Sequence, residues 1–118
     1  MNFKSLRESL SFDDVLLVPR YSDIESRTQV DVSSDLDHNL SFNLPVISSP
    51  MDTVTEEAMA VALHDAGGFG IVHRYNTIKE QSDIVRKIQE HDQEIPAAVA
   101  IGATGDYLAR AEMAVKLN

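Results

Sequence analysis

The sequence has 118 residues, with 10 basic and 19 acidic side chains that give a formal net charge of −9 at pH 7. This length fits one domain, and the 43% hydrophobic content is typical of a globular chain rather than a disordered one. The acidic balance argues against binding to nucleic acid or to an anionic membrane surface. Without cysteine, the chain has no disulfide, no thiolate metal site and no cysteine nucleophile.

No signal peptide is visible at the N-terminus, and we expect none. Residues Met1 to Ser5 are not followed by a long apolar stretch, and no apolar run in the sequence is long enough to span a bilayer. We therefore expect a soluble cytoplasmic protein.

Residues 1–44 form an N-terminal segment without glycine, in which short extended pieces alternate with polar turns. Residues 15–19 are an apolar run that ends at a proline. Residues 28–32 alternate polar and β-branched side chains, a pattern that predicts a short half-buried strand. Residues 35–39 are mostly polar and indicate a turn.

Residues 45–118 show a regular alternation of short apolar runs and helical patterns. The predicted strands are 45–48, 69–72 and 97–101, and the predicted helices are 53–66, 77–90 and 107–117. The pairs Thr53–Glu56 and Thr77–Glu80 have the spacing of a capping box at a helix start. Gly67 and Gly68 are expected to end the first helix, because glycine tolerates the left-handed conformation found there.

Each predicted helix has an apolar stripe expected to face the core. The stripes are Met59, Ala62, Leu63 and Ala66 in the first helix, Ile78, Ile84, Val85 and Ile88 in the second, and Leu108, Ala111 and Val115 in the third.

Apolar strands that alternate with amphipathic helices predict an α/β fold with a parallel sheet. Both an open doubly wound sheet and a barrel are built this way. Eight units of roughly 25 residues plus the N-terminal segment would total roughly 245 residues, close to the size of a TIM barrel. Periodicity alone does not choose between the two architectures.

Ligands bind at the carboxyl ends of the strands in both architectures, which draws attention to two places. Residues 48–52 follow the first strand, although a plain connector capped by Asp52 or Thr53 would explain them equally well. His73 and Arg74 end the second strand, where two positive groups would suit a phosphorylated ligand. A histidine bonded to a nearby carbonyl and an arginine paired with a carboxylate are the structural alternative.

Other polar and glycine-rich positions give weaker signals. The glycines at 67–70 precede a strand, so they do not form a dinucleotide-binding loop. Gly102 and Gly105 fit either the close approach of a ligand or a tight turn. Asp13–Asp14 is expected to be a turn or cap pair, and the histidines have no metal-ligand spacing, so no metal site is expected.

Three stretches of the sequence resemble the start of an IMP dehydrogenase. They are LSFDDVLLVP at 10–19, SSPMDTVTE at 48–56 and GGFGIVH at 67–73, and the similarity extends from about residue 8 to the end. The resemblance implies a (β/α)₈ TIM barrel and a homotetramer. It also implies NAD-dependent oxidation of inosine monophosphate (IMP) to xanthosine monophosphate (XMP) in purine biosynthesis, assisted by a potassium ion.

The resemblance also assigns residues. Ser49 and Met51 are expected to line the pocket for the purine nucleotide substrate, and Ser26 to lie near the NAD cofactor, while His73 and Arg74 stay candidates at the rim. The family's cysteine nucleophile and mobile flap follow the third βα unit, so no catalytic residue is expected in this chain. We expect an N-terminal portion of the enzyme that is inactive and only marginally stable alone.

Two alternatives stay open. Dehydrogenases commonly insert a regulatory pair of nucleotide-sensing modules before the third strand, but the connection at 91–96 is too short for them. GMP reductases, which convert GMP to IMP with NADPH, also lack the insertion, yet they are less similar at Thr55–Glu56. This favours the dehydrogenase over the reductase. The second alternative is a small α/β binding module without catalytic activity.

Overall fold

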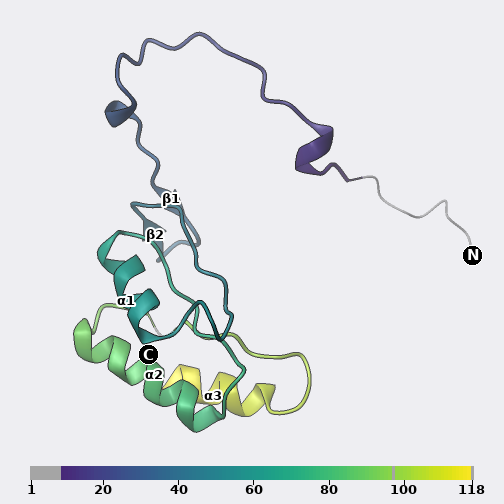
Figure 1. Ribbon diagram of the computed structural model, residues 1–118, viewed down its shortest axis with the longest axis vertical. Coiled ribbons are helices and arrows are strands. Elements are labelled where there is room, and N and C mark those ends of the chain that lie inside the picture. Colours follow the sequence, from purple (N-terminus) through teal and green to yellow (C-terminus); the bar gives the residue numbers. More distant parts are fainter. Residues whose placement is uncertain (1–8, 97, 118) are drawn as a thin grey trace, which may run out of the picture. The chain divides into compact units, whose positions relative to one another are not determined.

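The computed structural model describes residues 9–96 and 98–117 (Figure 1). Met1 to Ser5, in which no targeting signal was found, lie outside the described residues. The chain divides into two units, residues 1–30 and 31–118. No helix in the part that the structure describes is both long enough and apolar enough to cross a bilayer.

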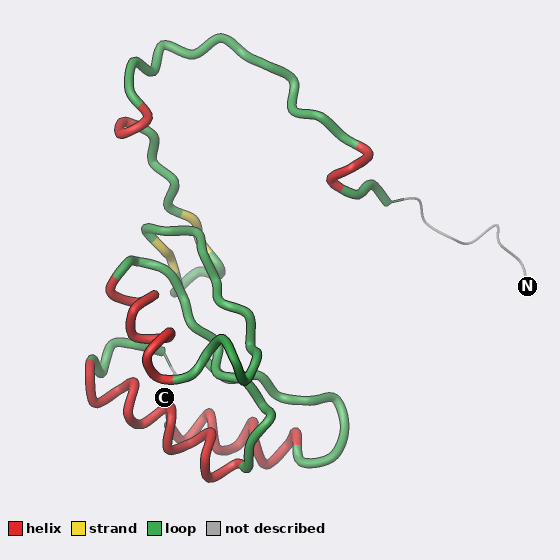
Figure 2. The backbone as a smooth tube through the Cα atoms, viewed as in Figure 1, coloured by secondary structure: helices red, strands yellow, loops and turns green. Residues whose placement is uncertain are grey.

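Residues 9–30 are extended except for two short 3-10 turns, Phe12–Asp14 and Arg27–Gln29 (Figure 2). Asp14 caps the first turn, since the amide and hydroxyl of Ser11 both donate to its carboxylate at 2.8 Å. These hydrogen bonds, led by the one from the amide, lower the pKa of Asp14. The turn or cap role predicted for Asp13–Asp14 is therefore confirmed.

The half-buried strand predicted at 28–32 is wrong. Residues Arg27–Gln29 form a 3-10 turn that begins at Ser26, and Val30 and Val32 are 44% and 52% exposed. Alternating side chains favour a strand only where a second strand pairs with it, and the structure describes no such partner here.

A short antiparallel hairpin opens the second unit. Strand β1, Ser34–Asp35, pairs with strand β2, Ser41–Phe42, with Ser34 opposite Phe42. The predicted turn lies between them and is closed by the amide of Leu36, which donates to the carbonyl of Leu40 at 2.8 Å. The buried ring of Phe42 lies 5.4 Å from that of Phe69, so the hairpin packs on the second apolar run.

The three apolar runs lie side by side and parallel, in their sequence order. Ile47 pairs with Phe69 and Val72 pairs with Val99, each as a parallel bridge. Amide-to-carbonyl bonds of 2.8 to 3.0 Å flank both bridges. The parallel α/β arrangement predicted from the sequence is present in these residues. Ala97, the first residue of the predicted third strand, lies outside the described part of the chain.

Three helices accompany these runs: α1, Glu57–Asp65; α2, Ile78–His91; and α3, Tyr107–Leu117 (Figure 1). Helix α2 packs against both α1 and α3. Its predicted capping box is confirmed, because Thr77 Oγ1 accepts from the Glu80 amide at 3.2 Å and Glu80 Oε2 accepts from the Thr77 amide at 2.8 Å.

Helix α1 begins four residues later than predicted. Glu56, not Thr53, is its N-cap, and the predicted Thr53–Glu56 capping box is wrong. Residues 52–54 form a turn instead, and the buried Thr55 uses its hydroxyl to hold the preceding loop. The predicted end is confirmed: Gly67, with φ +84°, donates its amide to the carbonyl of His64 at 2.8 Å.

The core centres on α2. The buried residues of this core are Ala60, Val72, Val85, Ile88 and Ile95, and the partly buried Ile84 packs against them. The predicted stripe of α2 is thus confirmed at Val85, Ile88 and Ile84. The stripes predicted for the other two helices do not hold.

In α1 only Ala60 is buried, while Met59 is 41% exposed. The reason is a close approach to the second apolar run: a Cβ added at Gly70 would lie 2.6 Å from the Ala60 Cα atom. This packing therefore requires a glycine at position 70. In α3, Leu108 and Val115 are exposed and Arg110 is the buried residue.

Candidate functional site

The loop at 48–52 follows the first apolar run, and the buried side chain of Thr55 holds it in place. Thr55 is fully buried, and its Oγ1 lies 2.8 Å from Ser48 Oγ and 2.5 Å from the Ser49 carbonyl oxygen. Its amide also donates to the Met51 carbonyl at 2.9 Å. The sequence analysis did not predict this anchoring role. The one indication was the position of Thr55, between the loop and Glu56, the N-cap of α1.

Ser49 and Met51 lie on this anchored loop and face solvent. Ser49 is exposed and Met51 is 48% exposed. The amide of Met51 donates to the carbonyl of Ser49 at 2.8 Å, which tightens the backbone between them. The loop therefore presents one hydroxyl and one flexible apolar side chain from a fixed backbone at the carboxyl end of its run.

His73 is buried at the end of the second run, with 2% of its surface exposed. The Tyr75 amide donates to Nδ1 at 3.1 Å, so Nδ1 is unprotonated and Nε2 carries the ring proton. Nε2 in turn lies 3.2 Å from the Glu56 carboxylate, to which it donates. The ring thus ties the N-cap of α1 to the second run.

Arg74 is exposed and lies across the end of the third run. Its guanidinium carbon is 5.8 Å from the centre of the Tyr75 ring, in a cation–π contact. A Cβ added at Gly102 would lie 3.0 Å from Arg74 Nη1, so a glycine there lets the arginine lie close to the backbone. Among the described residues Arg74 forms no ion pair, unlike the carboxylate pairing considered from the sequence.

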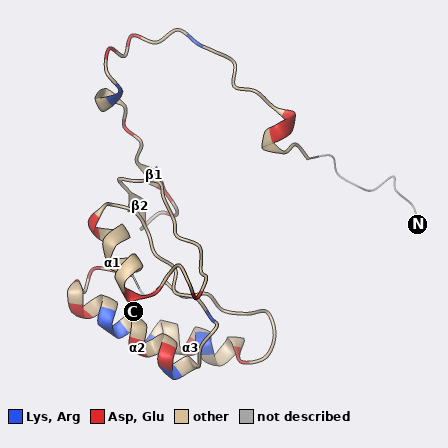
Figure 3. Cartoon of the chain, in the orientation of Figure 1, with Lys and Arg blue, Asp and Glu red and all other residues tan. Residues whose placement is uncertain are grey.

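A cavity of about 430 Å³ adjoins His73, between the start of α1 and helix α2. Four carboxylates line it against one lysine, so its charge does not suit an anionic ligand. Helix α2 itself carries residues of both charges (Figure 3). In the described part of the chain, no cluster of three or more His, Cys, Asp or Glu residues could hold a metal ion.

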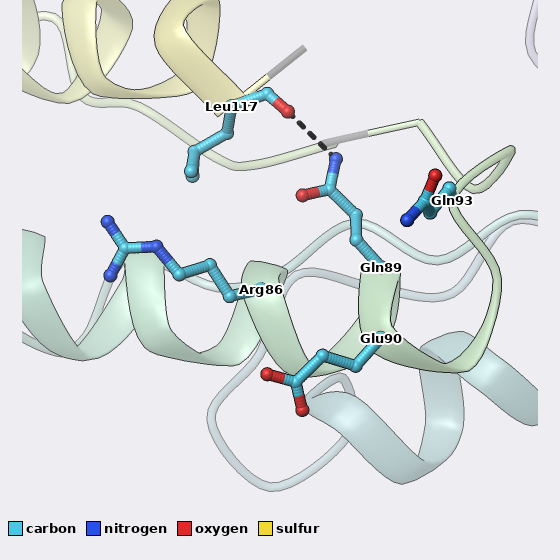
Figure 4. Close-up of a pocket in the computed structure, with 5 residues that line it drawn as sticks. All are labelled: Arg86, Gln89, Glu90, Gln93 and Leu117. Carbon is cyan, nitrogen blue, oxygen red and sulfur yellow. Dashed lines mark hydrogen bonds between the residues drawn. The ribbon is translucent and has the colours of Figure 1, made fainter.

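A second cavity, of about 440 Å³, lies between the last turns of α2 and α3 (Figure 4). Gln89 Nε2 donates to the carbonyl of Leu117 there at 2.9 Å. Arg86, Glu90 and Gln93 complete the lining. This cavity contains none of the residues predicted from the sequence to bind a ligand.

Ser26 belongs to residues 1–30, and its hydroxyl is engaged locally. It caps the turn Arg27–Gln29, where Ser26 Oγ lies 2.9 Å from Thr28 Oγ1 and 3.4 Å from the Thr28 amide nitrogen. The structure therefore gives Ser26 a capping role, and its place near the cofactor stays a prediction.

Comparison with known proteins relates this arrangement to one family. A curated inosine-5'-monophosphate dehydrogenase from Nitrosopumilus maritimus is 55% identical over 89 residues, which are 75% of this chain and 18% of that protein. The enzyme of that name from Aquifex aeolicus is 46% identical over the same shares. The chain therefore spans less than a fifth of the curated relatives it matches.

A solved structure and a family model cover more of this chain. The crystal structure of inosine 5' monophosphate dehydrogenase from Legionella pneumophila matches with a TM-score of 0.72 and 38% identity, over 94% of this chain and 33% of that one. The model described as "IMP dehydrogenase / GMP reductase domain" matches residues 9–118. Since that match takes in the anchored loop and all three helices, the chain belongs to the IMP dehydrogenase / GMP reductase family.

Proposed function

We propose that this chain forms part of an IMP dehydrogenase-type oxidoreductase, which oxidises IMP to XMP with NAD. The observation that carries the proposal is the loop at 48–52, fixed by Thr55 and open to solvent at Ser49 and Met51. The similar curated proteins are dehydrogenases, which favours the dehydrogenase over the reductase.

The fold proposed for the complete enzyme is a (β/α)₈ barrel. Residues 1–44 would form its N-terminal segment and residues 45–118 its first three βα units. The parallel order of the three apolar runs supports this, as does the likeness to the Legionella structure. The short connection between the end of α2 at His91 and the third run at Val99 supports our proposal that this enzyme has no regulatory insertion there.

The proposed nucleotide contacts follow from chemistry at the carboxyl ends of the runs. The hydroxyl of Ser49 can donate to or accept from a polar group of the nucleotide, and the thioether of Met51 can pack on the purine ring. Arg74 supplies a cation that has no carboxylate partner among the described residues, which suits a phosphate. His73 is buried against Glu56, so we assign it a supporting role instead of a ligand contact.

NAD would accept the hydride in this reaction. Ser26 is the candidate from this chain, and its hydroxyl is already bonded to Thr28. The chain also has no cysteine to attack the purine. We therefore place the nucleophile, the potassium site and the remainder of the NAD site in the rest of the enzyme, which we expect to be a cytoplasmic homotetramer.

A graft tests this proposal. The chain replaces the segment that it matches in the Nitrosopumilus maritimus enzyme, and NADH formation from IMP and NAD is followed by absorbance. We expect turnover from the graft and none from the purified 118-residue chain. A folded graft that neither binds IMP nor forms NADH would contradict the proposal, as would sustained turnover by the chain alone.

A further inference from the structure

The loop at 48–52 is tied to the second apolar run on both of its sides. Before the loop, the amide of Ser48 donates to the carbonyl of Phe69 at 3.0 Å. After the loop, the carboxylate of Glu56 accepts from Nε2 of His73 at 3.2 Å. The first tie is ordinary backbone pairing between neighbouring runs, whereas the second depends on two side chains. The second tie therefore calls for an explanation of its own.

The ring of His73 is held in place by its surroundings. The amide of Tyr75 donates to Nδ1 at 3.1 Å, and Gln81 Nε2 donates to the His73 carbonyl at 2.8 Å. His73 is 2% exposed, and a buried donor that lacks an acceptor costs free energy. The Nε2 proton therefore needs an acceptor, and Glu56 supplies one.

Glu56 joins this fixed ring to the start of α1. Its side chain is 59% exposed and forms no capping hydrogen bond to its own helix, so neither burial nor the helix fixes its position. Its backbone carbonyl accepts from the Ala60 amide at 3.0 Å, which begins the hydrogen bonding of the helix. The hydrogen bond from His73 therefore determines where the chain passes from the loop into α1.

Thr55 connects Glu56 to the loop. It directly precedes Glu56 and is fully buried, and its hydroxyl oxygen lies 2.5 Å from the Ser49 carbonyl oxygen. Its amide donates to the Met51 carbonyl at 2.9 Å. A shift at Glu56 would move the backbone of Thr55, and with it both residues that we propose to contact the nucleotide. A misplacement of about 1 Å is enough to weaken the effect of such groups.

We propose that His73 and Glu56 are positioning residues for the proposed nucleotide-binding loop. Their hydrogen bond fixes the point at which the chain enters α1, and Thr55 carries that constraint to Ser49 and Met51. The two residues act through the loop and contact no ligand themselves. This inference rests on the proposed function of the same loop.

Three variants at the exposed end of this hydrogen bond test the proposal in the graft. Glu56→Ala removes the acceptor from His73, and Glu56→Gln keeps an acceptor oxygen there. Glu57→Ala is the matched control, because it removes the carboxylate of the next residue and its 3.6 Å ion pair with Lys87. The two glutamate side chains are 59% and 49% exposed, so neither alanine opens a cavity in the core.

His73→Asn probes the same hydrogen bond from its buried end. The side-chain oxygen of asparagine can accept from the Tyr75 amide in place of Nδ1, but asparagine is too short to reach Glu56. His91→Asn is the control for this change, since His91 Nε2 lies 3.2 Å from Asp65 and so ties the opposite end of α1.

Two readouts separate positioning of the loop from a general loss of stability. Hydrogen exchange is followed in peptides that cover residues 48–56 and 78–91 of the graft, and KM for IMP and kcat are measured. We expect Glu56→Ala to speed exchange in 48–56 about tenfold, the scale of one lost hydrogen bond to a charged group, and to leave 78–91 within about twofold. We expect it to raise KM for IMP about tenfold while kcat changes less, as the loss of a binding contact does.

The other variants should divide into two groups. His73→Asn should shift both readouts in the direction of Glu56→Ala. Glu56→Gln should restore them to within about threefold of the unsubstituted graft, because only the charge on the acceptor is lost. The controls Glu57→Ala and His91→Asn should stay within about twofold, since exposed ion pairs contribute little.

Three outcomes would overturn the proposal. In the first, exchange in 48–56 is the same in Glu56→Ala and Glu57→Ala. In the second, Glu56→Ala speeds exchange equally in both peptides, because the hydrogen bond would then serve general stability. In the third, exchange in 48–56 is faster but KM for IMP is unchanged. If the unsubstituted graft binds no IMP, the proposed function itself fails, whereas normal IMP binding by Glu56→Ala overturns this inference alone.

Discussion

Helices α2 and α3 differ in how they place their apolar side chains. Helix α2 packs between α1 and α3 and buries Val85 and Ile88. Helix α3 packs against α2, exposes Leu108 and Val115 and buries Arg110. The central helix of a layer is covered on two sides, whereas a helix at the edge keeps an apolar face for an element that packs on it. In the proposed barrel, the next βα unit would supply that element.

The largest difference in stability is expected between alanine substitutions at a buried residue of α2, Ile88, and at an exposed residue of α3, Leu108. Ile88→Ala should lower the free energy of unfolding by about 2–5 kcal/mol, because it opens a cavity in the core. Leu108→Ala, at a side chain 62% exposed, should change it by less than about 0.5 kcal/mol. Chemical denaturation of both variants measures the contrast. Equal losses would mean that Leu108 is covered in solution.

The exposed apolar face of α3, formed by Leu108 and Val115, should drive self-association of the 118-residue chain. Association would remove this apolar surface from water, which is favourable. Combining Leu108→Glu with Val115→Lys should shift sedimentation toward the monomer and leave the thermal midpoint almost unchanged. Leu36→Glu, in the hairpin turn, is the control and should shift it less. A chain that is already a monodisperse monomer with one sharp unfolding transition would contradict this account.

A smaller difference in stability is expected between alanine substitutions at Thr77, which caps α2, and at Thr53, which does not cap α1. Thr77→Ala removes the hydroxyl that accepts from the Glu80 amide and should cost about 1 kcal/mol of stability. Thr53→Ala changes a residue with the same sequence spacing that caps no helix, and should have an effect within about 0.5 kcal/mol. If thermal unfolding shows equal losses, the start of α1 at Glu57 is in question.

The smallest expected effect is on pH dependence. The hydrogen bond from the Thr77 amide, followed by that from its hydroxyl, lowers the pKa of Glu80 in the folded chain. The stability from this group is therefore present above the ordinary glutamate pKa and is lost as the pH falls through the lowered one. Glu80→Gln should flatten the loss of stability below about pH 5, as measured by denaturation at several pH values. An unchanged acid limb would remove Glu80 from this role.

The sequence was sufficient to predict a helix where its capping residues and its hydrophobic periodicity agree, as in α2. Its capping box and its stripe both point to one start and one buried face. The start of α1 was misjudged because Thr55, not Thr53, has the decisive partner, and that partner lies in the loop at 48–52. The hydrophobic pattern also cannot show that Gly70 lets α1 approach closely at Ala60. Nor can it show that Arg110 is buried because it finds enough hydrogen-bond acceptors.

The candidate site was predictable in its place but not in its internal contacts. The rule that ligands bind at the carboxyl ends of strands drew attention to residues 48–52 and to Arg74, and the structure places them at such ends. No pattern in the sequence indicated that His73 would be buried against Glu56, since that contact joins residues 17 positions apart. Nothing in the sequence marked Gln81, and only the fold shows the two carbonyls that it bridges.

The affinity of the graft for IMP, with and without Ser49→Tyr, tests the central claim most directly. A tyrosine ring at Ser49 would fill the space above the loop without touching the hydroxyl of Thr55 that anchors it. Ser33→Tyr, at another exposed serine, is the matched control. We predict that calorimetric titration shows binding weakened at least about tenfold by Ser49→Tyr and unchanged by Ser33→Tyr. Equal dissociation constants for the two variants and the unsubstituted graft would contradict the assignment of this loop to the nucleotide.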